Sequence, residues 1–197
     1  MPDLREGTAV LVTGTPGTGK TTTSRLLARK LQASYLNPKS LLRHEGIDYV
    51  HDENRRTRVV SLKRLRNALC ERAARVDHGL VIDTHIALET GPRPRLVRAI
   101  VLRCDPIALE RRLERKRWSK SKIGENLLAE ILDICLWDTV KAYGWNRILE
   151  IDTTRESPRH VVERIMRDLE KKRIRKQPQV DWLSTLKRRG TLDQYLK

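Results

Sequence analysis

The segment Gly14–Thr21 constrains the fold of this 197-residue chain more than any other feature. Its sequence, GTPGTGKT, fits the phosphate-binding pattern G-x-x-x-x-G-K-[ST]. It lies between an apolar run, Thr8–Thr13, and an amphipathic stretch, Thr21–Gln32, which predict a buried strand and a helix. Glycines let the backbone curl around an anion, and the following helix adds the positive end of its dipole. The sequence therefore predicts an ATP-phosphate site between a first strand and a first helix.

The polar residues at this predicted site have distinct roles. Lys20 is predicted to bridge the β- and γ-phosphates of ATP, and the Thr21 hydroxyl to ligate Mg²⁺. Asp83 ends an apolar run, and parallel sheets bind ligands at the carboxyl ends of their strands, so Asp83 is predicted to hold Mg²⁺ through water. A helix cap is the alternative role for Asp83. His85 is predicted to position an attacking water or relay a proton, with a structural histidine as the alternative.

Further apolar runs and amphipathic stretches alternate along the chain. The runs predict strands at Ala33–Leu36, Gly79–Asp83, Ala99–Arg103 and Arg147–Ile151. The amphipathic stretches predict helices at Leu62–Ala74, from Pro106 to about Lys116, at Glu125–Tyr143 and at Pro158–Arg173. Strands that are apolar throughout and alternate with helices are typical of parallel sheets covered on both faces. The sequence therefore predicts an α/β fold with a parallel five-stranded sheet flanked by helices.

Three segments do not fit the alternation. The polar stretch Asn37–Thr57 and the basic stretch Trp118–Gly124 are predicted to be mobile loops inserted over the active site. Residues 174–197 are basic and lack regular periodicity apart from Val180–Leu183, which predicts an appended tail. The predicted boundaries are thus a kinase-type domain over residues 1–173 and a basic tail over residues 174–197.

The charge of the chain is unusual for a small metabolic enzyme. It has 41 Lys and Arg against 25 Asp and Glu, a net charge of +16, which indicates a polyanionic partner such as RNA or a ribonucleoprotein. Surface ion pairs of a heat-adapted protein are the alternative, but so large an excess cannot all be paired. The first residues do not resemble a signal peptide and no apolar run approaches about 20 residues, so we expect a cytoplasmic protein without a membrane partner. Cys70, Cys104 and Cys135 are expected to be buried free thiols.

Four stretches together resemble one family. The motif GTPGTGKTT, the pair Asp83-Thr84-His85, the stretch Leu102–Pro106 (LRCDP) and Val180-Asp181-Trp182 are similar to the atypical archaeal and nuclear adenylate kinases, also called coilin-interacting nuclear ATPases. The resemblance covers nearly the whole chain. It implies a P-loop nucleoside-monophosphate-kinase fold with small monophosphate-binding and lid inserts, adenylate kinase activity (ATP + AMP ⇌ 2 ADP) and a slow ATPase. It also implies a role in late maturation of the small ribosomal subunit and its rRNA, in a pre-30S particle, with the ribosomal protein uS11 as a transient partner.

The same resemblance implies roles for individual residues. ATP-phosphate contacts fall on the loop and first helical turn, at Gly17, Gly19, Lys20, Thr21 and Thr22. Gly14 and Thr18 of the same motif are also predicted to bind the nucleotide. Arg43 falls in the monophosphate-binding insert, about residues 37–57, where the family has an arginine for the AMP phosphate; its paired donors suit that task. The lid, about residues 115–125, departs from the family pattern because Lys116-Arg117-Trp118 replaces Arg-Gly-aromatic, which leaves Arg115, Lys116 or Arg117 as the cation that contacts ATP.

The sequence leaves three functions open. The first is a nucleoside-monophosphate kinase that prefers AMP and requires ATP and Mg²⁺. The second is an assembly factor that uses ATP as a switch, with kinase turnover incidental. The third is a P-loop kinase for another small molecule, because the sequence of the monophosphate-binding insert does not fix the acceptor. The residues Asp152–Thr154 are expected either to lead into the loop that borders adenine or to form an ordinary strand-to-helix turn.

Overall fold

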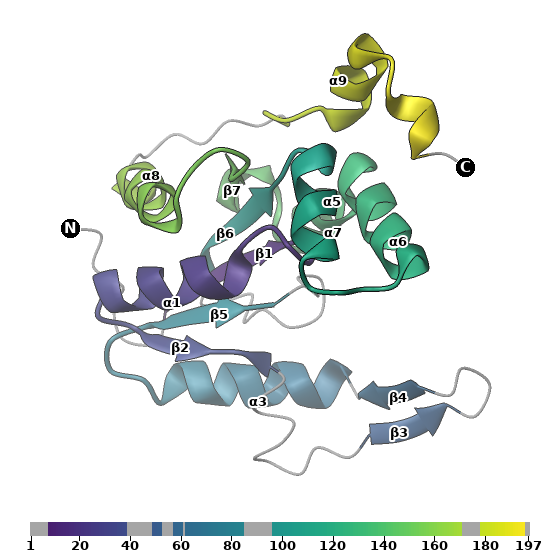
Figure 1. Cartoon of the computed structure of the whole chain (residues 1–197). Coiled ribbons are helices and arrows are strands. Elements are labelled where there is room, and N and C mark those ends of the chain that lie inside the picture. Colours follow the sequence, from purple (N-terminus) through teal and green to yellow (C-terminus); the bar gives the residue numbers. More distant parts are fainter. Residues whose placement is uncertain are drawn as a thin grey trace.

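Five parallel strands form the central sheet, in the order β2–β5–β1–β6–β7 (Figure 1). The strands are β1 (Ala9–Gly14), β2 (Ser34–Leu36), β5 (Leu80–Asp83), β6 (Leu96–Arg103) and β7 (Ile148–Asp152). The computed structural model describes residues 8–38, 49–52, 57–60, 62–84, 96–170 and 178–195. The predicted parallel five-stranded sheet is confirmed, and the strand that precedes the phosphate loop lies at its centre.

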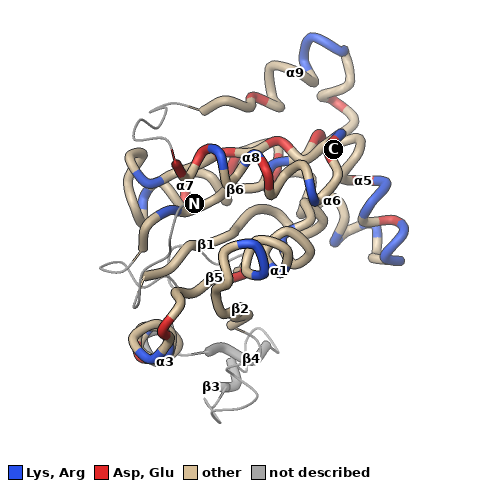
Figure 2. The backbone as a smooth tube through the Cα atoms, turned by 90° about the vertical axis from the view of Figure 1, so that its left-hand side faces the viewer, with Lys and Arg blue, Asp and Glu red and all other residues tan. Residues whose placement is uncertain are grey.

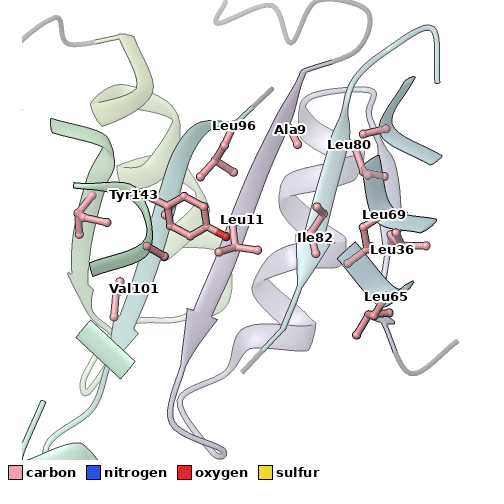
Figure 3. Close-up of a cluster of buried hydrophobic side chains, with 14 of the residues drawn as sticks. Ala9, Leu11, Leu36, Leu65, Leu69, Leu80, Ile82, Leu96, Val101 and Tyr143 are labelled. Carbon is pink, nitrogen blue, oxygen red and sulfur yellow. The ribbon is translucent and has the colours of Figure 1, made fainter. Parts of the chain in front are cut away.

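Helices cover both faces of this sheet because the strands are apolar on both sides. Alternate residues of β1 serve the two faces: Val10 and Val12 pack in a cluster with α1 (Lys20–Lys30) and α8 (Pro158–Glu170). Ala9 and Leu11 pack on the opposite face with α3 (Leu62–Ala74) and α7 (Ile134–Tyr143). Figure 3 shows this second cluster, with Leu11 between Tyr143 on one side and Ile82 on the other. Each fully buried Leu or Ile of this kind contributes about 1.5–3 kcal/mol, so the core fixes the position of β1.

The helix predicted over Glu125–Tyr143 is two helices, so that prediction is wrong. The first is α6 (Lys120–Ile131), and α7 begins after a break at Leu132 and Asp133. Asp133 has a φ of +57°, a left-handed conformation that Asp tolerates better than most residues. Its carboxylate bonds to the guanidinium of Arg103, and this contact favours the break over a continuous helix.

The predicted loop Trp118–Gly124 is also largely helical. Its last five residues form the start of α6, because the Ser119 hydroxyl caps the helix by accepting from the Lys122 N–H at 3.4 Å. The preceding helix, α5 (Pro106–Glu114), begins in the same way: Asp105 accepts from the Ile107 N–H at 2.9 Å, and Pro106 occupies the first helical turn. The segment predicted to form the lid, about residues 115–125, is therefore a short connection that leads into α6.

The C-terminal segment contains a helix where the sequence predicts no regular structure. The helix α9 (Trp182–Arg189) begins at Asp181, whose carboxylate accepts from the Ser184 N–H at 2.8 Å, and ends at Gly190, which has a φ of +66°. Trp182 and Leu186 are buried. A single-turn 3₁₀ helix, Leu192–Gln194, follows. Sequence periodicity missed α9 because an eight-residue helix has too few turns to establish it.

A small antiparallel sheet of β3 (Tyr49–Asp52) and β4 (Thr57–Val60) lies apart from the main sheet (Figure 1). It falls at the end of the polar insert predicted over Asn37–Thr57, most of which lies outside the described residues. The cysteines are free thiols, and Cys104 is buried as predicted, whereas Cys70 and Cys135 are only half-buried. None of the described helices has the length and apolar character needed to cross a membrane.

Candidate nucleotide-binding site

The segment Gly14–Thr21 connects β1 to α1 as a tightly curled loop. Gly14 has a φ of +137°, and a Cβ atom there would lie 2.2 Å from the Leu102 carbonyl oxygen of β6. Gly17 has a φ of +99°, and its Cβ would lie 2.7 Å from a methyl carbon of Leu109 on α5. Both positions therefore require glycine, for backbone conformation and for space. The loop can press against β6 and α5 only because these side chains are absent.

Hydrogen bonds hold the loop in this curled form. The Thr15 carbonyl accepts from the Thr18 N–H at 3.2 Å and from the Thr18 hydroxyl at 2.9 Å. The Thr18 carbonyl in turn accepts from the hydroxyl of Thr153, which follows β7, at 2.9 Å. A curled loop before a helix N-terminus is a preformed anion site, because its amides and the helix dipole favour negative charge. Gly19, Thr21 and Thr22 complete the predicted phosphate contacts at the start of α1.

The ammonium of Lys20 folds back over the loop. Its Nζ donates to the Thr15 carbonyl at 3.1 Å. Displacement of water by the surrounding protein lowers the pKa of Lys20 to about 8, although the carboxylates of Asp83 and Glu130 favour its charged form. A bound phosphate group would add negative charge beside Lys20. A nucleotide would therefore stabilise the charged form of this lysine.

Asp83 collects three donors at the carboxyl end of β5. Its Oδ2 accepts from the Thr21 hydroxyl at 2.7 Å, from the Tyr35 hydroxyl at 2.9 Å and from the Asn37 amide at 3.2 Å. Asp83 is only 2% exposed. The structure thus brings together the two oxygen groups predicted to hold Mg²⁺. The residues present fit this ion, because Mg²⁺ keeps several waters and commonly takes only one or two protein carboxylates besides the phosphates.

The remaining predicted site residues lie on the lid or outside the described residues. Arg115 and Lys116 are exposed at the end of α5. The charge of Lys116 contributes to lowering the pKa of Lys20, so Lys116 is close enough to act on the phosphate loop. Lys122 lies 4.0 Å and Lys116 5.8 Å from the ring centre of Trp118. Arg43 and His85 lie outside the described residues, and their roles stay predictions.

Sequence reasoning missed a buried ionic cluster behind the loop. Arg103, at the end of β6, is 1% exposed and binds Glu130 at 2.9 Å, Glu150 at 2.7 Å and Asp133. Although burial disfavours the charged form of Arg103, its carboxylate partners raise its pKa above the ordinary value. Burial raises the pKa of Asp133 and of Glu150. The sequence did offer one sign of this cluster, an arginine at the end of an apolar strand. Nothing in the sequence distinguishes Glu130 from the other polar residues of its helix.

The cluster reaches the phosphate loop itself. Glu130 Oε2 accepts from the hydroxyl of Thr15 at 2.5 Å. On the other side of the loop, Arg112 of α5 donates to the carbonyls of Thr153 at 2.9 Å and Thr154 at 3.1 Å. Asp152 accepts from the Thr154 N–H at 2.9 Å, as in an ordinary turn after a strand. A pocket of about 760 Å³ opens between α5, this turn and α9.

Several solved structures that resemble this fold are named as kinases. The chain resembles shikimate kinase from Acinetobacter baumannii with a TM-score of 0.59 and 20% identity, over 82% of this chain and 92% of that one. It resembles a gluconokinase from Sinorhizobium meliloti with a TM-score of 0.56 and 17% identity, over 84% and 93%. At such low identity these likenesses establish the fold alone. The sheet, its helices and the phosphate loop together define the fold of the P-loop kinases.

Relatives in sequence show which family of proteins with this fold the chain belongs to. Residues 10–133 match the family described as "AAA domain". A protein of Natronomonas pharaonis named "Putative adenylate kinase" is 37% identical over 79% of this chain and 86% of its own length. Proteins of the same name from Thermococcus onnurineus and Methanocaldococcus jannaschii are 34% and 30% identical, each over 88% of this chain. The chain therefore belongs to the AAA-domain family and to the same family as these archaeal relatives.

Proposed function

We propose that this protein is a nucleoside-monophosphate kinase that transfers the γ-phosphate of ATP to AMP. The observation that carries the proposal is the contact of Thr21 with Asp83 beside Lys20 on a curled phosphate loop. The family supports it, because its archaeal relatives have adenylate kinase in their names. Phosphoryl transfer needs little covalent help from a protein, so a site that positions phosphates and neutralises their charge is sufficient.

Each group of the site has a defined task in this reaction. The loop and Lys20 hold the β- and γ-phosphates, while an AMP phosphate oxygen attacks the γ-phosphorus and the bond to the β-phosphate oxygen breaks, which yields two ADP. Thr21 and Asp83 would hold Mg²⁺, which would shield the charge of the β- and γ-phosphates. Arg43, in the insert of about residues 37–57, is the proposed clamp for the AMP phosphate.

The lid supplies the remaining positive charge. Residues 111–122 contain seven Lys and Arg and one Glu. Lys116 is the proposed ATP contact, because its charge already acts at Lys20. Its ammonium is a single point charge, whereas the arginine of the family pattern offers paired donors, so Arg115 is the proposed second cation. A lid that closes over the phosphates excludes water, which competes with AMP as the acceptor.

A second function is favoured by the charge of the chain. The net charge is +16, and the residues from Arg155 onward have 13 Lys and Arg against 6 Asp and Glu. Figure 2 shows Lys and Arg on several elements, including α5 and the end of α9. We propose that the protein also acts in the cytoplasm as an ATPase in late maturation of the small ribosomal subunit, where rRNA and uS11 are the candidate partners. Polyanion contacts of this kind weaken steeply as salt is added.

Dependence on an acceptor distinguishes the two functions. ADP release from ATP is measured with each nucleoside monophosphate, with none, and with small-subunit ribosomal particles. A kinase shows release that requires a monophosphate, with AMP the best. An ATP-driven assembly factor shows release that the ribosomal partner stimulates. Lys20→Ala, which removes the cation at the phosphates, is the inactive control for both.

Two variants refine this assignment. In hydrolysis a water must be oriented and must lose a proton, whereas AMP brings its own ionised oxygen. His85→Ala is therefore expected to slow hydrolysis by about 10²–10⁴-fold and to slow AMP phosphorylation much less. Arg43→Ala is expected to show the reverse pattern. If both variants slow both reactions equally, neither residue has its proposed role. If hydrolysis drives release from the partner, His85→Ala should also stay bound to small-subunit proteins after ATP is added, in a pull-down with and without ATP.

A further inference from the structure

The C-terminal segment is attached to the fold through three carboxylates, one of which, Glu130, contacts the phosphate loop. The contacts run from Trp182 Nε1 to Glu130 at 3.1 Å, from the Gln179 N–H to Glu150 at 2.5 Å, and from Arg189 to Asp105 at 2.5 Å. Asp105 also caps α5, and Glu150 also binds Arg103. The segment is thus bonded to the same cluster that supports the loop, although Figure 1 shows α9 at the far end of the molecule from the β3–β4 hairpin.

Glu130 is the residue that joins the C-terminal segment to the loop. Its Oε1 accepts from Trp182 Nε1, from Arg103 Nε and from the Cys104 N–H, and its Oε2 accepts from the Thr15 hydroxyl. Glu130 and Thr15 are each 1% exposed and Trp182 is 7% exposed. Water cannot readily replace a lost donor at such depth. Without the Trp182 N–H, Glu130 Oε1 keeps Arg103 and the Cys104 N–H as donors and loses the one that comes from α9.

Thr15 connects Glu130 to Lys20. Its hydroxyl binds Glu130, and its carbonyl accepts from Lys20 Nζ at 3.1 Å and from the Thr18 N–H at 3.2 Å. Three successive contacts therefore connect Trp182 to Lys20: indole to carboxylate, carboxylate to Thr15, and Thr15 to ammonium. These residues come from different elements, and α9 supplies one of the contacts that hold Glu130 in place.

We propose that Trp182 is a positioning residue for ATP, and that α9 is a part of the nucleotide site that acts through Glu130 and Thr15. The proposal rests on ATP binding at the loop, as proposed above. With the indole N–H in place, Glu130 is oriented to hold the Thr15 hydroxyl and the loop is already shaped for phosphate. Without it, ATP must bear the cost of ordering the loop, and its affinity falls. A Trp182 that merely filled space would affect stability and leave ATP affinity unchanged.

The test is a double-mutant cycle on the full-length chain. Trp182→Phe keeps an aromatic ring and removes the N–H donor, and Thr15→Val keeps the shape of threonine and removes its hydroxyl. Affinity for Mg·ATP is measured by calorimetry for each variant, for the double variant and for Thr15→Ser, which keeps the hydroxyl. Leu183→Ala is the matched control, because Leu183 is 44% exposed on the same helix. Thermal unfolding of each variant reports on stability separately.

We expect Trp182→Phe and Thr15→Val each to weaken ATP binding by about 3- to 30-fold, the range of such couplings. Thr15→Ser should weaken it less than Thr15→Val, and Leu183→Ala should bind as the wild type does. In the Thr15→Val background, Trp182→Phe should have little further effect, because the contact through which it acts is already absent. An unchanged affinity in Trp182→Phe, or an equal loss in both backgrounds, would overturn the proposal. If the wild-type chain fails to bind ATP, the proposed function fails instead.

A reverse measurement remains available if Trp182→Phe does not fold. The chain has four tryptophans, so the ¹⁵N indole signal of Trp182 can be assigned by substituting the other three in turn. Adding Mg·ATP to the wild-type chain should shift this signal, and the shift should be strongly reduced in Thr15→Val at saturating ATP. A signal that ATP leaves unmoved, or that moves equally in Thr15→Val, contradicts the link between α9 and the loop.

Discussion

Removing the guanidinium of Arg103 should be among the most damaging single changes in the fold. Arg103 is the cation that Glu130, Asp133 and Glu150 share, and it is 1% exposed. Arg103→Met keeps the volume and leaves these three carboxylates without their shared counter-charge. Breaking a buried ion pair by removing one partner costs about 3–5 kcal/mol. At about 2–4 °C per kcal/mol for a domain of this size, the melting temperature should fall by about 10 °C.

The pH dependence of this loss of stability shows whether the unpaired carboxylates cause it. Burial already raises the pKa of Asp133 and Glu150 above their ordinary values of 3.8 and 4.5, and loss of Arg103 raises them further. A carboxylate whose pKa is higher in the folded protein weakens folding progressively as the pH rises above its unfolded pKa. The loss should therefore be largest at pH 7–8 and should shrink towards pH 5.

Urea and thermal unfolding of Arg103→Met and the wild-type chain at pH 7.5 and pH 5.0 test this reasoning. Arg164→Met is the matched control, because Arg164 pairs with Glu156 at the surface, where the side chains are 33% and 30% exposed. Such a pair contributes about 0–1 kcal/mol. An Arg103→Met loss no larger than that of Arg164→Met, or one that is independent of pH, would refute the argument.

Two further predictions concern the phosphate loop. Because the pKa of Lys20 is about 8, this lysine is charged below that pH and loses its charge above it. The affinity for ATP should therefore be highest below pH 8 and should fall by about tenfold at pH 9. The affinity of Lys20→Arg should change little between pH 7 and 9. Equal pH profiles for the two proteins, measured by calorimetry, would remove Lys20 as the titrating group. Gly17→Ala should destabilise the protein by about 1–3 kcal/mol and abolish ATP binding, since its Cβ would lie 2.7 Å from Leu109 at a φ of +99°. At Gly124 in α6 a Cβ atom would meet no atom within 4 Å, so Gly124→Ala should stabilise the protein by about 0.5–1 kcal/mol. If urea unfolding gives the two variants the same stability, neither backbone conformation nor space matters at Gly17.

The sheet could be predicted from sequence because its signals are local. Apolar runs such as Thr8–Thr13 and Gly79–Asp83 are long enough to mark buried strands, and each is followed by residues that end it. The break between α6 and α7 could not be predicted, because it depends on the contact of Asp133 with Arg103, thirty residues away. The start of α6 carried a local signal, the serine cap at Ser119, but the run of lysines around it suggested a loop.

The candidate site divides in the same way. Lys20 and Thr21 follow from a contiguous motif, and Asp83 follows from its place at a strand end, so the sequence predicts residues that the structure brings together at the loop. Glu130 supports that motif from a helix more than a hundred residues further on, and only the folded chain brings it to Thr15. Contacts that join distant segments leave no spacing in the sequence that could reveal them.

β1 is synthesised first, yet it lies in the middle of the sheet. Ala9 pairs with Leu80 on one side and with Leu96 on the other, while β2 pairs with β5 and not with β1. At about 5–20 residues per second, a ribosome needs about 5–20 s to supply these neighbours. During that time the apolar strand before the phosphate loop has no neighbouring strand in the sheet, and the loop cannot yet pack against β6 and α5. A nucleotide that binds at this loop can therefore stabilise only those nascent chains that already include β6 and α5.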